Sequence, residues 1–194
     1  MLTQQDIDNM KQSLASGVQV VAVPQLFETS NDLAQRMIDE ACLEPEHSVL
    51  EPSAGTGKLI EAILNDGLTW QNISIVEQNR QLCDVLSKKY KRVYPGDFLE
   101  RCSWELGGKF DRIIMNPPFI NGSDIKHIEH ALTMLKNNGR LVAICANGPR
   151  QQAKLKPLAE NSGGFYEPLP AGTFKDKGTN VNTALLVIEG ANND

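Results

Sequence analysis

The sequence has few cysteines and no long apolar run, and each absence restricts the class of protein. Its four cysteines, which form no Cys-x-x-Cys pair and no Cys/His spacing typical of zinc, are Cys42, Cys83, Cys102 and Cys145. We therefore expect reduced thiols, no metal site and a cytoplasmic location. No apolar run approaches the roughly 20 residues that span a membrane, so no membrane association is expected. The polar N-terminus resembles neither a secretory signal nor an Arg-rich transit peptide.

The sequence also lacks an excess of positive charge. Its 19 lysines and arginines face 24 aspartates and glutamates, which gives a formal net charge of −5. A protein that binds nucleic acid through phosphates alone is usually basic, so any such contact here must be local or shared with a partner. With 194 residues, no repeat and no low-complexity tract, the chain is expected to form a single domain.

A regular alternation of strand and helix patterns is present instead. Short apolar runs predict strands at 48–52, 73–77, 92–96, 110–116, 140–147 and 182–189. Helical spacing predicts helices at 31–42, 58–65, 79–90 and 124–137, with Gly139 as the C-cap of the last. Residues 4–16 predict a polar helix within an N-terminal extension, 1–24. The alternation predicts an α/β fold, a Rossmann-like, doubly wound and mainly parallel sheet with helices on both faces. Ligands of such sheets bind beyond the carboxyl ends of the strands.

The first predicted strand ends in a glycine-rich turn, Glu51-Pro52-Ser53-Ala54-Gly55-Thr56-Gly57-Lys58, that leads into a helix. A turn of this kind lets a ligand approach bare backbone. A magnesium-dependent phosphate loop does not fit, because Pro52 stands where its first glycine is required and Leu59 replaces its Ser or Thr. A nucleoside-binding loop fits better, and a tight turn without a ligand is the alternative.

Acidic residues follow the next two predicted strands. Glu77 ends the second strand, 20 residues after Gly57. A carboxylate there can accept hydrogen bonds from both hydroxyls of a ribose, although a solvated strand end is the alternative. Asp97 and Phe98 follow the third strand. Taken alone, that aspartate is better explained as a turn former.

The most specific motif is Asn116-Pro117-Pro118-Phe119, directly after the fourth predicted strand. Two prolines fix φ and make the strand end rigid. The Asn116 side-chain oxygen and the Pro117 carbonyl can both accept from one amino group, and the Phe119 ring can stack on a planar group. Two acceptors suit methyl transfer to an aromatic amine, because they favour a pyramidal nitrogen and stabilise its developing positive charge. A proline-stiffened turn is the structural alternative.

Together these motifs resemble class I S-adenosylmethionine-dependent methyltransferases that act on amino nitrogens, most closely adenine-N6 methyltransferases of nucleic acid. The resemblance spans about residues 25–189. It implies a seven-stranded sheet, S-adenosyl-L-methionine as cofactor, and DNA or RNA as substrate. It also implies catalytic roles for Asn116, Pro117 and Phe119. The implied cofactor-binding residues are Thr29, Glu51, Ser53, Ala54, Gly55, Gly57, Glu77, Asp97, Phe98 and Asn116. Among them, Asp97 would hold the amino group of the cofactor's adenine and Phe98 would pack on its ring.

Two flanking segments extend the resemblance. Phe27-Glu28-Thr29-Ser30 resembles the segment that contacts the methionine part of the cofactor, where Thr29 would either bind through its hydroxyl or cap the following helix. Residues 174–183 resemble a late motif that pins the target base, which would make Phe174 the second face of an aromatic clamp with Phe119. A solvated Gly/Lys loop is the alternative reading of that segment.

Two other functions stay open. Methyltransferases of protein glutamine amides use a closely similar Asn-Pro-Pro-aromatic motif, and a cofactor-binding subunit without activity would share the glycine loop. No segment of the sequence is large enough to be a separate target-recognition domain, so a partner could supply specificity. Three basic residues could contact phosphate or form a solvated helix face: Arg150, Lys154 and Lys156.

Overall fold

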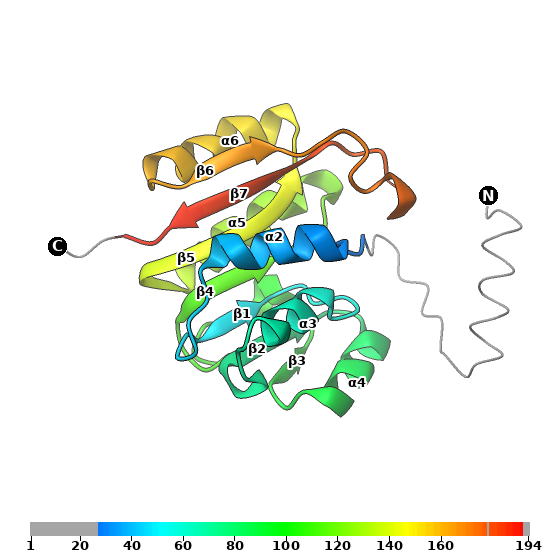
Figure 1. The fold of residues 1–194 in the computed structure, drawn as a ribbon, viewed down its shortest axis with the longest axis vertical. Helices are drawn as coiled ribbons and strands as arrows, with labels where there is room; N and C mark the ends of the chain where they lie inside the picture. Colours follow the sequence, from blue (N-terminus) through cyan, green and yellow to red (C-terminus); the bar gives the residue numbers. More distant parts are fainter. Residues whose placement is uncertain (1–26, 178, 192–194) are drawn as a thin grey trace, which may run out of the picture.

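The computed structural model describes residues 27–177 and 179–191 (Figure 1). The helix expected at 4–16 and the extension at 1–24 lie outside the described residues. The strands are β1 (Val49–Glu51), β2 (Ile73–Glu77), β3 (Val93–Pro95), β4 (Phe110–Met115), β5 (Leu135–Ala146), β6 (Phe165–Pro168) and β7 (Thr183–Glu189). The helices are α2 (Asn31–Ala41), α3 (Lys58–Asn65), α4 (Arg80–Lys89), α5 (Ser123–Thr133) and α6 (Pro149–Asn161). Short 3-10 turns lie at η1 (Trp70–Asn72), η2 (Phe98–Glu100), η3 (Ile120–Gly122) and η4 (Lys175–Lys177).

The seven strands form one sheet in the order β3-β2-β1-β4-β5-β7-β6. The pairs from β3 to β5 are parallel, and β7 runs antiparallel to both β5 and β6. The strand order reverses between β1 and β4, which places the loops after these two strands side by side at the point where open α/β sheets bind ligands. The predicted α/β class, doubly wound order and mainly parallel sheet are confirmed.

Alternate residues of the sheet supply two hydrophobic cores, one on each face. In β5, Val142 and Ile144 belong to the core under α2 and α3, whereas Leu141 and Ala143 belong to the core under α5 and α6. Figure 1 shows α2 and α3 on one face of the sheet and α5 and α6 on the other. A strand buried on both faces reads as a continuous apolar run, which is why these strands were visible in the sequence. No helix among residues 27–177 and 179–191 is long and apolar enough to cross a membrane.

The predicted helix at 124–137 is too long. It ends at Thr133, and β5 begins at Leu135, which pairs with Phe110 of β4. Strand pairing overrides the helical spacing here, because the Phe110 N–H donates to the carbonyl of Met134 at 2.9 Å. Gly139 is therefore not a helix C-cap but lies within β5, where a Cβ atom would come within 2.9 Å of the Lys136 carbonyl oxygen.

The sequence patterns also missed α6 and β6. Helix α6 contains Pro157 and a weakly apolar face, and β6 is a short edge strand with half-buried and exposed side chains, so neither has a clear period. The basic cluster on α6 is partly neutralised. Lys154 lies 3.7 Å from Glu129, and Lys156 lies 3.7 Å from Glu160.

Candidate active site

The backbone conformation of the glycine loop, which connects β1 to α3, brings it against the end of β2. Gly55 and Gly57 have φ of 56° and 90°, the left-handed region in which glycine has no steric penalty. The Gly55 N–H donates to the Glu77 carboxylate at 2.6 Å, and the Ala54 N–H donates to the Val76 carbonyl at 3.1 Å. A Cβ atom on Gly57 would lie 2.9 Å from a methyl group of Leu86, so this glycine serves helix packing as well as the turn.

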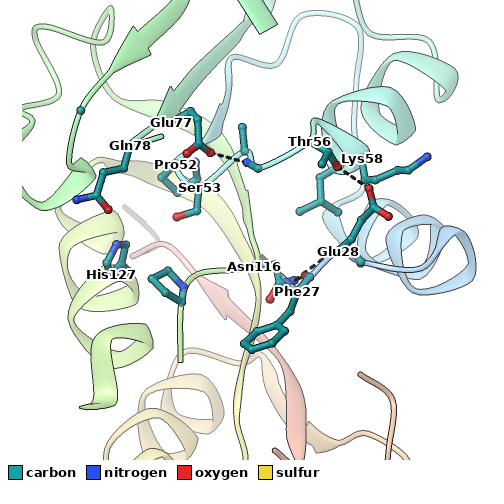
Figure 2. Close-up of a pocket in the computed structure, with 16 residues that line it drawn as sticks. Phe27, Glu28, Pro52, Ser53, Thr56, Lys58, Glu77, Gln78, Asn116 and His127 are labelled. Atoms are coloured by element: carbon teal, nitrogen blue, oxygen red, sulfur yellow. Dashed lines mark hydrogen bonds between the residues drawn. The ribbon is translucent and has the colours of Figure 1, made fainter. Parts of the chain in front are cut away.

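A pocket opens between this loop, the end of β4 and the start of α2 (Figure 2). Its lining residues are Phe27, Glu28, Thr29, Pro52, Ser53, Ala54, Gly55, Thr56, Lys58, Leu59, Glu77, Gln78, Gly96, Asn116, Pro118 and His127. The structure thus gathers Thr29, Ser53, Ala54, Gly55, Glu77 and Asn116 of the predicted site into one pocket. Glu51, Gly57, Asp97, Phe98, Pro117, Phe119 and Phe174 are not part of this lining.

Glu77 lies at the pocket wall with 8% of its surface exposed. One carboxylate oxygen accepts from the Gly55 N–H and the other from the Asn79 N–H, both at 2.6 Å. Burial raises the pKa of Glu77, and the backbone N–H groups of Asn79, Gly55 and Gln78 oppose that rise. Each oxygen keeps lone-pair capacity for one more donor, so the side chain is oriented for two ligand hydroxyls.

Asn116 has a fixed side-chain orientation. Its Nδ2 donates to the Phe27 carbonyl at 2.9 Å and to the Thr29 hydroxyl at 3.1 Å. Of the two ends of the amide, only the NH₂ group can donate to a carbonyl, so the amide oxygen must point the other way. That Oδ1 is buried and has no hydrogen-bond partner among the described residues. Thr29 therefore orients the asparagine, whereas Ser30 caps α2 by accepting from the Leu33 N–H at 3.4 Å.

Glu51 is the second unpartnered polar group. It is 1% exposed, and neither of its carboxylate oxygens has a hydrogen-bond partner within the described part of the chain. Burial raises the pKa of Glu51 well above its usual range. The nearby Ser53 backbone N–H opposes part of that rise, and the charge of Glu77 adds a smaller increase. A buried acceptor without a donor costs free energy, which a bound cationic or N–H group would relieve.

The aromatic residues form a packed cluster. Phe119 is 7% exposed, stacks on Phe27 with ring centroids 5.9 Å apart, and meets the edge of Phe174 at 6.1 Å. Phe119 and Phe174 are thus brought together, but they meet edge to face and do not form two parallel plates. One face of Phe119, the ring expected to hold a planar substrate group, is stacked against Phe27.

Asp97 and Phe98 follow β3 as predicted, but their side chains lie beside the pocket. Asp97 caps η2 by accepting from the Leu99 N–H at 2.9 Å. The Phe98 ring is 2% exposed and packs edge to face on His130 at 4.8 Å. The turn role therefore accounts for the observed Asp97 contact, and the Phe98 ring does not face the pocket.

Lys58, Gln78 and His127 line the pocket but were not predicted as site residues. Lys58 and Gln78 stand next to predicted ligands in the sequence, so their positions could have been inferred. His127 had no such signal, because a histidine on the buried face of α5 has the same helical spacing as a core residue.

The residues present fit a nucleoside that carries an amino acid. Glu77 is a carboxylate at the end of β2, a position suited to the hydroxyls of a ribose, and the loop of Ser53 and Gly55 offers close backbone approach. At one end of the pocket Glu28 and Lys58 present opposite charges, which suits an ammonium and a carboxylate (Figure 2). The fold and the pocket together define a class I methyltransferase with S-adenosylmethionine as cofactor. No group of three or more His, Cys, Asp or Glu side chains suited to a metal ion occurs among the described residues.

Residues 18–163 match the methyltransferase small domain family, and the chain belongs to that family. Over 80 residues it is 38% identical to modification methylase CviBIII of Paramecium bursaria Chlorella virus NC1A. That match covers 39% of this chain and 20% of the viral protein, so the similarity concerns only a fifth of the length of this curated relative.

Solved structures share the fold. A protein of Pyrococcus horikoshii, provisionally classed as an RNA methyltransferase, superposes with a TM-score of 0.65 at 18% identity, over 94% of this chain and 98% of its own. The methyltransferase subunit of a type I restriction-modification system from Streptococcus thermophilus has a TM-score of 0.65 at 18% identity, over 84% of this chain and 44% of its own. At such identities the likeness shows the fold alone.

Glu77→Ala is expected to weaken binding of S-adenosylhomocysteine about fivefold to a hundredfold. The change removes the two expected ribose contacts, of roughly 0.5–1.5 kcal/mol each. It also releases the Gly55 N–H, which holds the loop in place. Glu77→Gln keeps one acceptor oxygen and should give an intermediate Kd. Titration calorimetry measures all three proteins, and an unchanged Kd for Glu77→Ala would contradict the ribose role.

Glu51 should make the stability of the ligand-free protein depend on pH. Because its pKa is raised in the folded state, the folded state binds the proton more tightly than the unfolded chain does. The contribution of this group to the free energy of unfolding is largest below the unfolded pKa of about 4.3. That contribution is lost as pH rises toward the folded pKa. Glu51→Gln replaces the titrating carboxyl with a neutral amide. The Tm of this variant should therefore rise relative to that of wild type as pH increases from about 5 to about 8. The matched control is the exposed Glu100→Gln. Parallel Tm curves for Glu51→Gln and wild type would show that the buried carboxylate is compensated.

Proposed function

We propose that the protein methylates an amino nitrogen of nucleic acid, with N6 of adenine as the target, in DNA or RNA. When bound, S-adenosylmethionine supplies an activated methyl group. The observation that carries the proposal is the buried, unpartnered Oδ1 of Asn116, held in place by its Nδ2 contacts to Phe27 and Thr29. An acceptor that is oriented by the protein and left without a donor is suited to an N–H of the substrate.

The proposed chemistry uses few groups of the chain. Asn116 Oδ1 and the Pro117 carbonyl accept the two hydrogens of the target amine, which draws the nitrogen lone pair out of conjugation with the ring. The same two dipoles stabilise positive charge as the nitrogen is methylated. No strong base is needed before attack, because the alkylated nitrogen becomes acidic and then loses its proton. Phe119 and Phe174 would hold the target ring.

A nucleic-acid substrate is supported by the relatives and by one surface residue. The viral relative is named a modification methylase, and the S. thermophilus neighbour is a subunit of a restriction-modification system. At the start of α6, Arg150 is exposed and forms no ion pair with another described residue, unlike Lys154 and Lys156. Arg150 is therefore the basic residue of this cluster available to phosphate. We further propose that a separate partner supplies sequence recognition.

A protein glutamine amide is the second candidate, and the charge favours it. The net charge is −5, and Lys154 and Lys156 of α6 each lie 3.7 Å from a glutamate, so α6 offers little unpaired positive charge to phosphates. A side-chain amide offers the same two N–H donors and the same planar shape to Asn116 and Phe119.

Tritiated S-adenosylmethionine offered with DNA, RNA and protein extract decides between them. We expect label in nucleic acid, and N6-methyladenine when the product is digested to nucleosides and weighed by mass spectrometry. Asn116→Ala serves as the inactive control. Label only in protein would replace the leading proposal with the second. Cofactor binding without transfer to any of the three would indicate a non-catalytic subunit.

A further inference from the structure

The pocket has two ends that differ in chemistry, with Glu77 between them. Figure 2 shows Gln78 and His127 at one end and Glu28 and Lys58 at the other. The charged end suits the amino-acid part of the cofactor. Asn116, which would meet the target amine, must lie near the methyl group, between the ribose and that amino acid. The end with His127 is therefore left for the adenine ring of the cofactor.

The hydrogen-bond partner of His127 shows which ring nitrogen carries the proton. The Nδ1 atom lies 2.8 Å from the carbonyl oxygen of Ser123, one helical turn earlier. A carbonyl oxygen only accepts, so Nδ1 must carry the hydrogen. The Nε2 atom of the neutral ring is then a bare acceptor. Burial lowers the pKa of His127, which favours this neutral form.

The Nε2 atom of His127 has no hydrogen bond to another described residue, although the ring is 7% exposed and lines the pocket. Within the described part of the chain, the ring's hydrogen-bond contacts are those of Nδ1 with the Ser123 carbonyl and hydroxyl. The ring is held from behind by Phe98, with centroids 6.0 Å apart. The acceptor is thus fixed in place and left free for a ligand.

We propose that His127 Nε2 accepts a hydrogen bond from the 6-amino group of the cofactor's adenine and so selects adenosyl over other nucleosides. This inference rests on the cofactor orientation that the proposed amine site implies. It assigns to His127 the contact expected of Asp97. The Asp97 carboxylate is outside the pocket lining and is used to cap η2.

Two ligands and five proteins test the assignment: wild type, two variants of His127, and one variant each of His130 and Asp97. S-Inosylhomocysteine differs from S-adenosylhomocysteine by a 6-oxo group in place of the 6-amino group, so it presents an acceptor to His127. His127→Phe keeps a ring against Phe98 and removes the acceptor, and His127→Ala removes it independently. His130→Phe is the matched control, because His130 also packs on Phe98 but bonds to the Arg101 carbonyl at 2.9 Å, outside the pocket. Calorimetry gives Kd for both ligands, and thermal melts check folding.

Wild type and His130→Phe are expected to prefer the adenosyl ligand about tenfold. Both His127 variants should lose most of this preference by binding the adenosyl ligand about threefold to tenfold more weakly. Preference retained in the His127 variants would overturn the assignment, and its loss in Asp97→Asn would then return the contact to Asp97. Failure of wild type to bind either ligand would instead refute the cofactor itself.

Discussion

Asn116→Ala is expected to lower the rate of methyl transfer by about a hundredfold to a thousandfold. The side chain supplies a prepositioned dipole at the atom where positive charge develops, and such a group acts more strongly in a buried site than in water. Affinity for S-adenosylhomocysteine should change only about twofold, because Oδ1 is proposed to meet the target amine. Single-turnover rates and calorimetric Kd values separate the two effects.

Two further variants show whether the orientation of Asn116 matters. Thr29→Val removes one of the two acceptors that hold Nδ2 and leaves Oδ1 in place, so it should reduce the rate about tenfold at most. Asn116→Asp keeps an oxygen but turns the donor to the Phe27 carbonyl into a second acceptor, which should be as damaging as alanine. If Asn116→Ala retained most of the turnover, the Asn-Pro-Pro turn would be purely structural.

The parts of the site that were predictable are those fixed by the local backbone. A strand followed by a glycine turn, and a strand followed by two prolines, determine where Gly55 and Asn116 lie whatever packs around them. The parallel order of β1, β2 and β4 then brings their carboxyl ends together, so Glu77 reaches the Gly55 N–H without any further signal.

The parts that were not predictable depend on packing between distant segments. His127 faces the pocket because of how α5 packs on the sheet. Its spacing from the apolar residues of α5 is that of an ordinary core residue. Phe27 covers Phe119 across more than ninety positions of sequence, and no local pattern reports such a contact. The end of α5 was misjudged for the same reason, because pairing of Leu135 with Phe110 ended a helical pattern that continued in the sequence.

Phe119 is expected to contribute to both stability and activity, and the two should separate by variant. Phe119→Ala removes a buried ring from between Phe27 and Phe174, which should cost about 3–5 kcal/mol of stability and lower Tm by roughly 10 °C. Phe119→Leu keeps most of the buried volume and should cost about 1 kcal/mol. Phe119→Tyr keeps the ring.

Activity should follow ring shape instead of volume. A flipped target base that stacks on the ring gains about 1–3 kcal/mol. Leucine and alanine should therefore both lower kcat/KM about tenfold to a hundredfold, while tyrosine keeps most of it. Kinetics and melts on the same preparations compare the two orders. If kcat/KM ranked the variants as Tm does, with leucine close to wild type, Phe119 would be a core residue and its stacking role would be wrong.

Substitution of Phe27 tests the stacking of Phe27 on Phe119 from the other ring. Its ring is half-buried and covers the Phe119 face at a centroid distance of 5.9 Å with an interplanar angle of 11°. A substrate ring that uses this face must displace Phe27, which costs the aromatic contact of roughly 0.5–1.5 kcal/mol. Phe27→Ala removes that competitor and leaves the backbone carbonyl that orients Asn116. It should therefore raise kcat/KM about twofold to tenfold even as it lowers Tm. A fall in kcat/KM as large as that of Phe119→Ala would show that the substrate contacts the Phe27 ring itself, and that the face of Phe119 stays covered during the reaction.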